Sequence, residues 1–293
     1  MSNLLKLFLN KKCTIVIWFY LKGYMIKFIK ATASGNDFVI IDNRDYSIKE
    51  YSNFVVTACN RKFGIGADGV IFIENDADSD FLMKYFNADG FEGSFCGNGA
   101  RCSAKFMSKI LNKNFVKFKA VGKLYSADVC EKNVKLYLPD LQKDIKKYNF
   151  DFTDCNIKAD FIDTGSPHIV IFEENISNQK GFEYIDVYHL GRAIRYHQSL
   201  APGGANINFV KKVNNNSIKV RTYERGVEDE TLACGTGSIA SAILFSSISS
   251  AKPPISVFTQ GGEKFKVDFK LSIDEVSNLL LEGSAIMVFE GVF

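Results

Sequence analysis

Two stretches of this chain carry a cysteine and two glycines in the same order. They are Cys96-Gly97-Asn98-Gly99-Ala100-Arg101-Cys102-Ser103-Ala104 and Cys234-Gly235-Thr236-Gly237-Ser238-Ile239-Ala240-Ser241-Ala242. Each stretch leads into residues that we expect to form a helix. Glycines let backbone N–H groups turn toward a ligand, and the N-terminus of a helix favours an anion, including a thiolate. The repeat therefore predicts two thiols that face one substrate from opposite sides.

Length and composition predict a globular protein with two ordinary domains. The chain has 293 residues, of which 46% are hydrophobic and 24% are charged. Its formal net charge is only +3, and its Lys and Arg residues do not gather in one stretch. We therefore expect no nucleic acid partner, because proteins that bind nucleic acid concentrate these residues in a patch.

The seven cysteines are odd in number and spread along the chain. This usage argues against a secreted disulfide framework and indicates the reducing cytoplasm. No Cys-x-x-Cys spacing occurs, and the three histidines do not lie near cysteines at the spacing of metal ligands. The sequence therefore indicates no metal site.

Residues 1–24 need a separate interpretation. Lys11 and Lys12 precede an apolar run, residues 13–21, which is too short to span a bilayer. No small-residue cleavage site follows this run, and Met25 begins a new strand-like run. We interpret residues 1–24 as an N-terminal extension and expect no membrane partner. A membrane anchor or an export signal is the alternative.

The first half of the remaining chain is expected to place its cysteine motif between short strands and a helix. Strands at 26–29 and 38–41 flank a turn with Asn36 at its tip, where a polar side chain could reach a ligand. The alternative is that Asn36 belongs only to a hairpin turn. The other expected elements are a helix at 52–60, strands at 70–73 and 81–86, a helix after Cys96 that ends at Asn112, and strands at 115–120, 124–129 and 134–138.

The second half repeats this order after a polar link expected at 143–150. The expected elements are strands at 161–163, 169–172, 207–210 and 218–223, helices at 185–196 and 238–246, and strands at 256–259, 265–269 and 285–290. Because both halves share this order, we infer an internal duplication. The predicted fold is α+β, with two pseudo-symmetric domains, each a curled mixed or antiparallel sheet wrapped around a central helix. The active site is expected in the cleft between them.

Several motifs in order resemble the diaminopimelate epimerase family. Phe86-Asn87-Ala88-Asp89-Gly90 precedes the first cysteine motif, and Tyr223-Glu224-Arg225-Gly226 followed by Thr231-Leu232-Ala233 precedes the second. Further matches are Ser34-Gly35-Asn36-Asp37-Phe38, Gly64-Ile65-Gly66-Ala67-Asp68 and Asn206-Ile207-Asn208-Phe209-Val210. The resemblance covers residues 25–293. It implies one domain at 25–140, completed by 281–293, and a second domain at 141–280.

The resemblance implies a cofactor-free, pyridoxal-independent enzyme that interconverts LL- and meso-diaminopimelate for lysine and peptidoglycan precursor synthesis. It also implies a homodimer. Inverting a stereocentre needs a base on one face and an acid on the other, which Cys96 and Cys234 would supply as thiolate and thiol. Backbone N–H groups of Gly97, Gly235 and Thr236 would stabilise the carbanion formed beside the carboxylate.

The same resemblance assigns roles to polar side chains. The residues that would hold the polar ends of the substrate are Asn36, Asn87, Asn98, Ser166 and Asn206. Arg225 would bind a carboxylate as a planar fork donor, and Glu224 would accept from a substrate ammonium. The alternative for these two residues is an ion pair at the end of a strand. His168 and Glu224 match positions that tune the thiols.

Three residues depart from the family pattern. Ser166 stands where the family often has Asn, Gly203 stands where an acidic residue is common, and Gly69 stands where some members have Gln. A serine can still donate and accept hydrogen bonds. These departures therefore bear on fine specificity and not on the reaction.

Three other functions remain open. A proline or hydroxyproline racemase also uses two cysteines, but it usually carries His where Asn98 stands. A non-catalytic binding protein with the same fold would not need both cysteines. A thiol redox protein would join Cys96 and Cys234 in a disulfide, although a dedicated one usually carries Cys-x-x-Cys.

Overall fold

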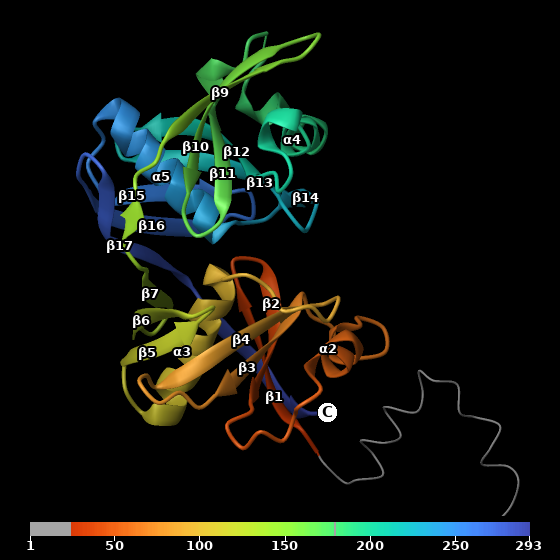
Figure 1. The fold of residues 1–293 in the computed structure, drawn as a ribbon. Helices are drawn as coiled ribbons and strands as arrows, with labels where there is room; N and C mark the ends of the chain where they lie inside the picture. Colours follow the sequence, from red (N-terminus) through yellow and green to blue (C-terminus); the bar gives the residue numbers. More distant parts are fainter. Residues whose placement is uncertain (1–24, 179) are drawn as a thin grey trace, which may run out of the picture.

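The computed structural model describes residues 25–178 and 180–293, so the interpretation of residues 1–24 lies outside the described residues. Figure 1 shows two lobes, one above the other, and each lobe wraps its strands around one helix. The described strands join a single 18-stranded sheet. Within the described ranges, no helix is long and apolar enough to cross a membrane, and no group of three or more His, Cys, Asp or Glu side chains could hold a metal.

The N-terminal lobe contains a mixed sheet and two helices. Its strands are β1 (Lys27–Ala33), β2 (Asn36–Asp42), β3 (Gly69–Glu74), β4 (Phe81–Asn87), β5 (Phe115–Ala120), β6 (Lys123–Val129), β7 (Asn133–Tyr137) and β18 (Ile286–Val292), and its helices are α2 (Tyr51–Cys59) and α3 (Gly97–Leu111). The pairs β1–β2 and β3–β4 are antiparallel, β2–β3 and β4–β5 are parallel, and β5–β6 and β6–β7 are antiparallel. The last strand, β18, pairs antiparallel with β1.

The C-terminal lobe repeats this order of strand pairs. Its strands are β8 (Leu141–Gln142), β9 (Lys146–Asp151), β10 (Asn156–Asp163), β11 (Pro167–Phe172), β12 (Asn206–Asn214), β13 (Ser217–Glu224), β14 (Asp229–Thr231), β15 (Ile255–Thr259), β16 (Lys264–Leu271) and β17 (Glu275–Ser284). Its helices are α4 (Val187–Arg195), α5 (Gly235–Ser249) and three 3₁₀ turns, η2 (Glu173–Asn175), η3 (Phe182–Tyr184) and η4 (Gln198–Leu200). From β10 on, the pairs are antiparallel, parallel, antiparallel, parallel, antiparallel and antiparallel, as they are from β1 to β7. The predicted α+β class and the predicted duplication are confirmed.

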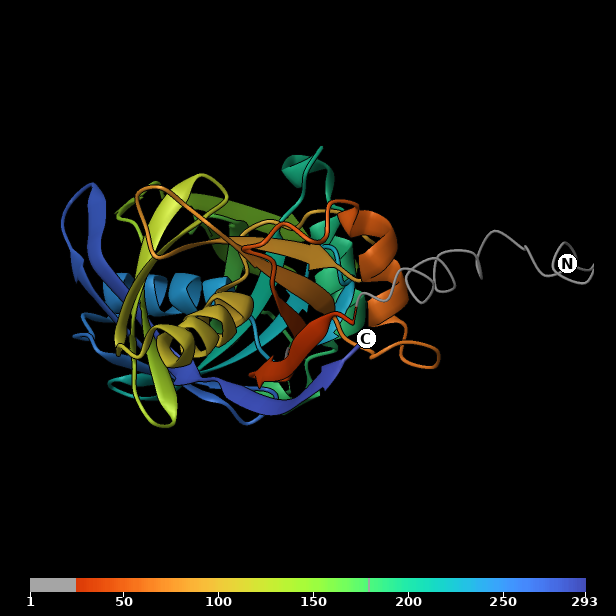
Figure 2. The ribbon, with the colours of Figure 1, turned by 90° about the horizontal axis from the view of Figure 1, so that it is seen from below.

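Helices α3 and α5 fill the centres of the two lobes. Figure 2, seen from below, shows strands on several sides of α3. In each helix a buried serine lies seven residues after the cysteine and donates to the carbonyl four residues earlier. Ser103 Oγ donates to Gly99 O at 2.9 Å, and Ser241 Oγ donates to Gly237 O at 2.7 Å. Because these hydroxyls are satisfied within the helix, the small side chains can be buried against the sheet without loss.

The polar link expected at 143–150 is wrong. Its second part forms β9, which pairs antiparallel with β10 from Lys146 to Asp151. This segment forms a strand because burial alternates from one residue to the next. Phe150 is fully buried and Tyr148 is half-buried, whereas their neighbours Lys147 and Asn149 are exposed. The other expected helices and strands are present with shifted boundaries.

The sequence analysis did not predict β17, the strand that joins the lobes. Strand β17 pairs antiparallel with β16 on one side and with β7 on the other. In Figure 1 it runs from the upper lobe into the lower one. Its pattern is interrupted because Asn278 has a φ of 53° and the register with β16 shifts between Asp268 and Lys270. Strict alternation, the usual signal of a strand, is therefore lost.

We expect Phe118→Ala to destabilise the protein far more than Phe115→Ala, although both residues belong to β5. Phe118 is fully buried in the core around α3, whereas Phe115 is 43% exposed. Removing the buried ring leaves a cavity and should cost about 3–5 kcal/mol, while the exposed ring should cost less than about 1 kcal/mol. Urea unfolding measures both values. Equal losses would contradict the described core.

Candidate active site

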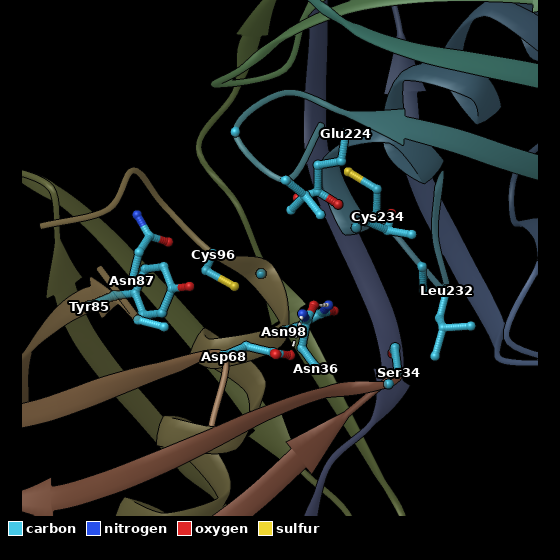
Figure 3. Close-up of a pocket in the computed structure, with 18 of the residues that line it drawn as sticks. Ser34, Asn36, Asp68, Tyr85, Asn87, Cys96, Asn98, Glu224, Leu232 and Cys234 are labelled. Atoms are coloured by element: carbon cyan, nitrogen blue, oxygen red, sulfur yellow. Dashed lines mark hydrogen bonds between the residues drawn. The ribbon is translucent and has the colours of Figure 1, made fainter. Parts of the chain in front are cut away.

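A cavity of about 800 Å³ opens between the lobes, and both cysteine motifs reach it. In Figure 3 the sulfur atoms of Cys96 and Cys234 lie on opposite sides of this space. The predicted site residues that line it are Asn36, Asn87, Cys96, Gly97, Asn98, Glu224, Arg225, Cys234, Gly235 and Thr236. The structure therefore gathers most of the predicted residues in one place.

Each cysteine is the residue that precedes the first turn of its helix. Cys96 is the N-cap of α3, and its Sγ accepts a hydrogen bond from Gly99 N at 3.4 Å. Cys234 is the N-cap of α5, and its Sγ lies 3.5 Å from Thr236 Oγ1. The first backbone N–H groups of a helix have no partner inside it. Both helices therefore direct free donors and the positive end of their dipoles toward the thiols.

Burial controls the protonation of the two thiols. It raises the pKa of Cys96 to about 11 and the pKa of Cys234 to about 12. The N–H of Gly99 lowers the pKa of Cys96, whereas the negative charge of Glu224 raises the pKa of both thiols. Burial also raises the pKa of Glu224 itself. Without a ligand, both thiols therefore hold their protons strongly, and one of them must lose its proton to act as a base.

A chain of hydrogen bonds fixes the amide side chains on the N-terminal side of the cavity. Asn98 Nδ2 donates to Asn36 Oδ1 at 2.6 Å, and Asn36 Nδ2 donates to Asp68 Oδ2 at 3.1 Å. Arg61 donates to Asp68 Oδ1 at 2.7 Å and to Asp37 Oδ1 at 2.7 Å. Asn36 and Asn98 therefore have set orientations before any ligand arrives, which reduces the ordering cost of binding.

Three predicted site residues do not line the cavity: Ser166, His168 and Asn206. Asn206 is buried, and its Nδ2 donates to Ser166 Oγ at 2.8 Å and to Pro167 O at 3.1 Å. Its Oδ1 accepts from the backbone N of Arg225 at 2.9 Å. In the described residues, Asn206 thus holds the backbone that carries Arg225.

His168 is fully buried behind the cavity wall. Asn208 Nδ2 lies 3.1 Å from its Nδ1, and Asn208 Nδ2 also donates to Ile169 O at 3.0 Å. Burial, and then the charge of Arg225, lowers the pKa of His168 to about 3, so the ring is neutral. Because the amide nitrogen donates to Nδ1, the ring proton lies on Nε2, which has no partner among the described residues.

Sequence reasoning missed Tyr85, which lines the cavity beside Asn87 and Cys96. Tyr85 and Asn87 share one face of β4 because they are two residues apart, and this spacing could have revealed the tyrosine. A Cβ built on Gly69 would clash with Phe86 O and would lie 2.5 Å from Tyr85 Cε2. The backbone of β4 and the tyrosine ring therefore occupy the space where a side chain at position 69 would begin, which explains the glycine there.

Sequence reasoning also missed the charged pair Asp68 and Arg61, which both line the cavity. Asp68 ends the Gly64–Asp68 motif, so a signal was present. The glycines of that motif indicated only a tight turn before a buried strand. The backbone N of Asp68 donates to Asp37 Oδ1 at 3.0 Å and thereby holds the turn against β2.

Comparison with known proteins places the chain in a family. The family model described as diaminopimelate epimerase matches residues 28–138 and 161–286. The diaminopimelate epimerase of Aquifex aeolicus is 40% identical over 281 residues, covering 91% of this chain and 97% of that protein. The diaminopimelate epimerase of Flavobacterium psychrophilum is 39% identical over 268 residues, covering 90% and 99%.

Solved structures share the fold at low sequence identity. A probable proline racemase from Agrobacterium radiobacter K84 superposes with a TM-score of 0.67 at 12% identity, covering 91% of this chain and 92% of that chain. A phenazine biosynthesis protein of the PhzF family from Bacillus anthracis gives 0.65 at 12% identity, covering 92% and 99%. These likenesses show the fold alone. Because the family model and the closely matched relatives each cover most of the sequence, the chain belongs to the diaminopimelate epimerase family.

Proposed function

We propose that this protein interconverts LL- and meso-diaminopimelate without pyridoxal phosphate, in the synthesis of lysine and peptidoglycan precursors. The observation that carries the proposal is the placement of Cys96 and Cys234 at equivalent helix N-termini on opposite sides of one cavity. Family membership supplies the substrate, because the relatives from Aquifex aeolicus and Flavobacterium psychrophilum are named diaminopimelate epimerases.

The reaction removes one proton from the α-carbon and adds another to its opposite face. The thiolate of one cysteine takes the α-proton, and the electron pair of the C–H bond stays on the carbon beside the carboxylate. The thiol of the other cysteine then gives its proton to the opposite face and becomes the thiolate. N–H groups of Gly97, Gly235 and Thr236 at the two helix N-termini stabilise the charge that spreads onto the carboxylate.

The polar side chains around the cavity favour a substrate with polar groups at both ends. Glu224 can accept from an ammonium group and Arg225 can donate to a carboxylate. Asp68 and Arg61, in contrast, are paired with each other. Further polar groups on the N-terminal side are the amides of Asn36, Asn87 and Asn98. Proline has one carboxylate and one ring nitrogen, so it would leave some of these amides without a ligand partner, which supports diaminopimelate over the proline racemase alternative.

The amides have two kinds of role in this proposal. Asn36, Asn87 and Asn98 contact the polar ends of the substrate directly, because they line the cavity. Asn206, with Ser166, acts through the backbone of Arg225 that it holds.

The same resemblance leads us to propose a cytoplasmic homodimer with domains at 25–140, completed by 281–293, and at 141–280. The antiparallel pairing of β18 with β1 supports the assignment of the last residues to the first domain. His168 and Glu224 would tune the thiols in each protomer. The negative charge of Glu224, which raises the pKa of both thiols, supports the role proposed for this residue.

We expect Cys96→Ala and Cys234→Ala each to reduce epimerisation by roughly 100- to 10,000-fold, since each removes one of the two proton-transfer groups. The measurement is deuterium incorporation at the α-carbon and epimer formation from LL-diaminopimelate, under reducing conditions and without pyridoxal phosphate. Cys130→Ala, at an exposed cysteine outside the cavity, is the control and should keep full activity.

Failure of the folded, reduced wild-type protein to exchange the α-proton would overturn the substrate assignment. Proline and hydroxyproline would then be tested in the same assay. Absence of exchange together with reversible formation of a Cys96–Cys234 disulfide would instead favour the redox alternative.

We expect Glu224→Gln to let both thiols react with iodoacetamide at lower pH than in the wild type. The negative charge of Glu224 raises the pKa of Cys96 and of Cys234, so its removal lowers both pKa values and increases the thiolate fraction at a given pH. Rates of alkylation at each cysteine, followed by peptide mass spectrometry across pH, measure this shift. Asp89→Asn is the matched control, because Asp89 lines the cavity but is not among the charges that act on either thiol. A shift of equal size in the control would rule out the specific effect of Glu224.

A further inference from the structure

The two cysteine motifs differ in charge at one fully buried position. Arg101 lies five residues after Cys96, and Ile239 lies five residues after Cys234. Both side chains have no exposed surface. A duplicated structure thus holds a cation in one half where the other half holds a hydrocarbon. Burying a guanidinium is costly unless the charge is needed, so this difference calls for a physical reason.

The guanidinium of Arg101 is surrounded by neutral oxygen atoms. It donates to Asn98 Oδ1 and to Ser34 Oγ at 2.8 Å each, to Ser284 O at 3.1 Å and to Gly97 O at 3.3 Å. Its other contact is the ring of Phe265, whose centroid lies 5.0 Å from Arg101 Cζ. Within residues 25–178 and 180–293, Arg101 forms no ion pair. Its hydrogen bonds are satisfied, but no carboxylate in direct contact neutralises its charge.

The titratable groups that interact electrostatically with Arg101 are the thiol of Cys102, the carboxylate of Glu263 and the thiol of Cys96. Glu263 forms no ion pair with Arg101 in the described residues, and its two carboxylate oxygens accept from Ser284 N at 2.8 Å and from Ser284 Oγ at 2.9 Å. Cys102 is fully buried outside the cavity, whereas Cys96 lines it. Cys96 is therefore the group at the reaction centre that the buried charge can serve.

The other charged and titratable groups act on the two thiols in different ways. Cys96 is under the opposing influence of Arg101 and of Glu224, which lies across the cavity on β13. Tyr85 also faces Cys96, from β4. Cys234 is under the influence of Glu224 and of Cys96. Helix α5 carries no Lys or Arg, and Ile239 stands where α3 has Arg101, so the two halves are electrostatically unequal although their strand pairings match.

We propose that Arg101 is a positioning residue whose buried charge makes Cys96, and not Cys234, the thiol of the pair that loses its proton first. This inference rests on the proposed function only for the use made of the thiolate. Cys96 then takes the α-proton first, Cys234 gives its proton to the opposite face, and turnover leaves Cys96 as thiol and Cys234 as thiolate. The pair returns to its starting form by exchange of protons with water or by the reverse reaction.

The same side chain also orients a substrate-binding amide. Because Arg101 donates to Asn98 Oδ1, the Asn98 amide must present its Nδ2 to Asn36. Cys96 and Asn98 are thus controlled by one buried cation. The matching position in the second motif, Ile239, offers Thr236 no such partner.

The test measures the pH dependence of iodoacetamide alkylation at each cysteine, without substrate, by peptide mass spectrometry. In the wild type, Cys96 should reach half of its maximal rate at lower pH than Cys234. In Arg101→Met, the profile of Cys96 should move to higher pH, with a rate roughly tenfold lower on the rising part of the curve. The Cys234 profile should stay in place. Arg101→Lys, which keeps the charge but not the fork, should keep the Cys96 profile close to that of the wild type.

The matched control is Ile239→Val, at the equivalent position of α5, and it should move neither profile. Buried Cys59 and Cys102 report on folding, since they react only if the lobe opens. If Arg101→Met is unfolded by this criterion, the wild-type order and Arg101→Lys decide the matter. Wild-type Cys234 titrating below Cys96, or an unchanged Cys96 profile in folded Arg101→Met, would overturn the proposal. Because no step uses the substrate, these outcomes are independent of whether the protein epimerises diaminopimelate.

Discussion

The N-termini of α3 and α5 both approach the side chain of one leucine, and this shared neighbour links the two halves of the cavity. A Cβ built on Gly97 would lie 3.8 Å from Leu281 Cδ2, and one built on Gly235 would lie 3.2 Å from the same atom. Leu281 belongs to β17, the strand that pairs with both lobes. A single strand therefore sets how far apart the two groups of backbone donors lie. Preorganised donors of this kind do not have to reorient as charge develops, which is their advantage over water.

Burial of the two thiols is the energetic cost of that arrangement. Both thiols are less acidic than in water because burial disfavours their thiolates. A thiol that holds its proton strongly is a poor base until its proton is removed, but its thiolate is then a strong base. The helix N-termini lower this cost for both sulfur atoms, and a buried cation lowers it further for one. The same low polarity strengthens each hydrogen bond that the cavity offers to a ligand.

The features of this structure that could be predicted are those that short stretches of sequence determine. The cysteines at helix N-termini follow from the glycines beside them, and the duplication follows from two stretches with the same spacing. Strand β17 could not be predicted, since its pairing with β7 and β16 depends on partners far away in the chain. The distinction between residues that line the cavity and those that support it was also hidden. Asn206 resembles Asn36 in sequence, but three hydrogen bonds within the protein use its amide.

Duplication explains why a two-sided site arises readily, and divergence explains why it can work on one substrate. Two identical halves would present the same donors and the same thiol acidity to both faces of the α-carbon. The substrate is not symmetric about that carbon, since one side continues into a chain that carries the distal ammonium and carboxylate. Its distal groups need partners on one side only, and the polar side chains that the N-terminal lobe brings to the cavity, Asn36, Asn87 and Asn98, have no exact counterparts among the described residues of the other lobe. The difference between Arg101 in one half and Ile239 in the other also makes the two halves unequal. This inequality matters because a proton can cross from one thiol to the other, by way of the substrate, only when one sulfur is a thiolate and the other is a thiol.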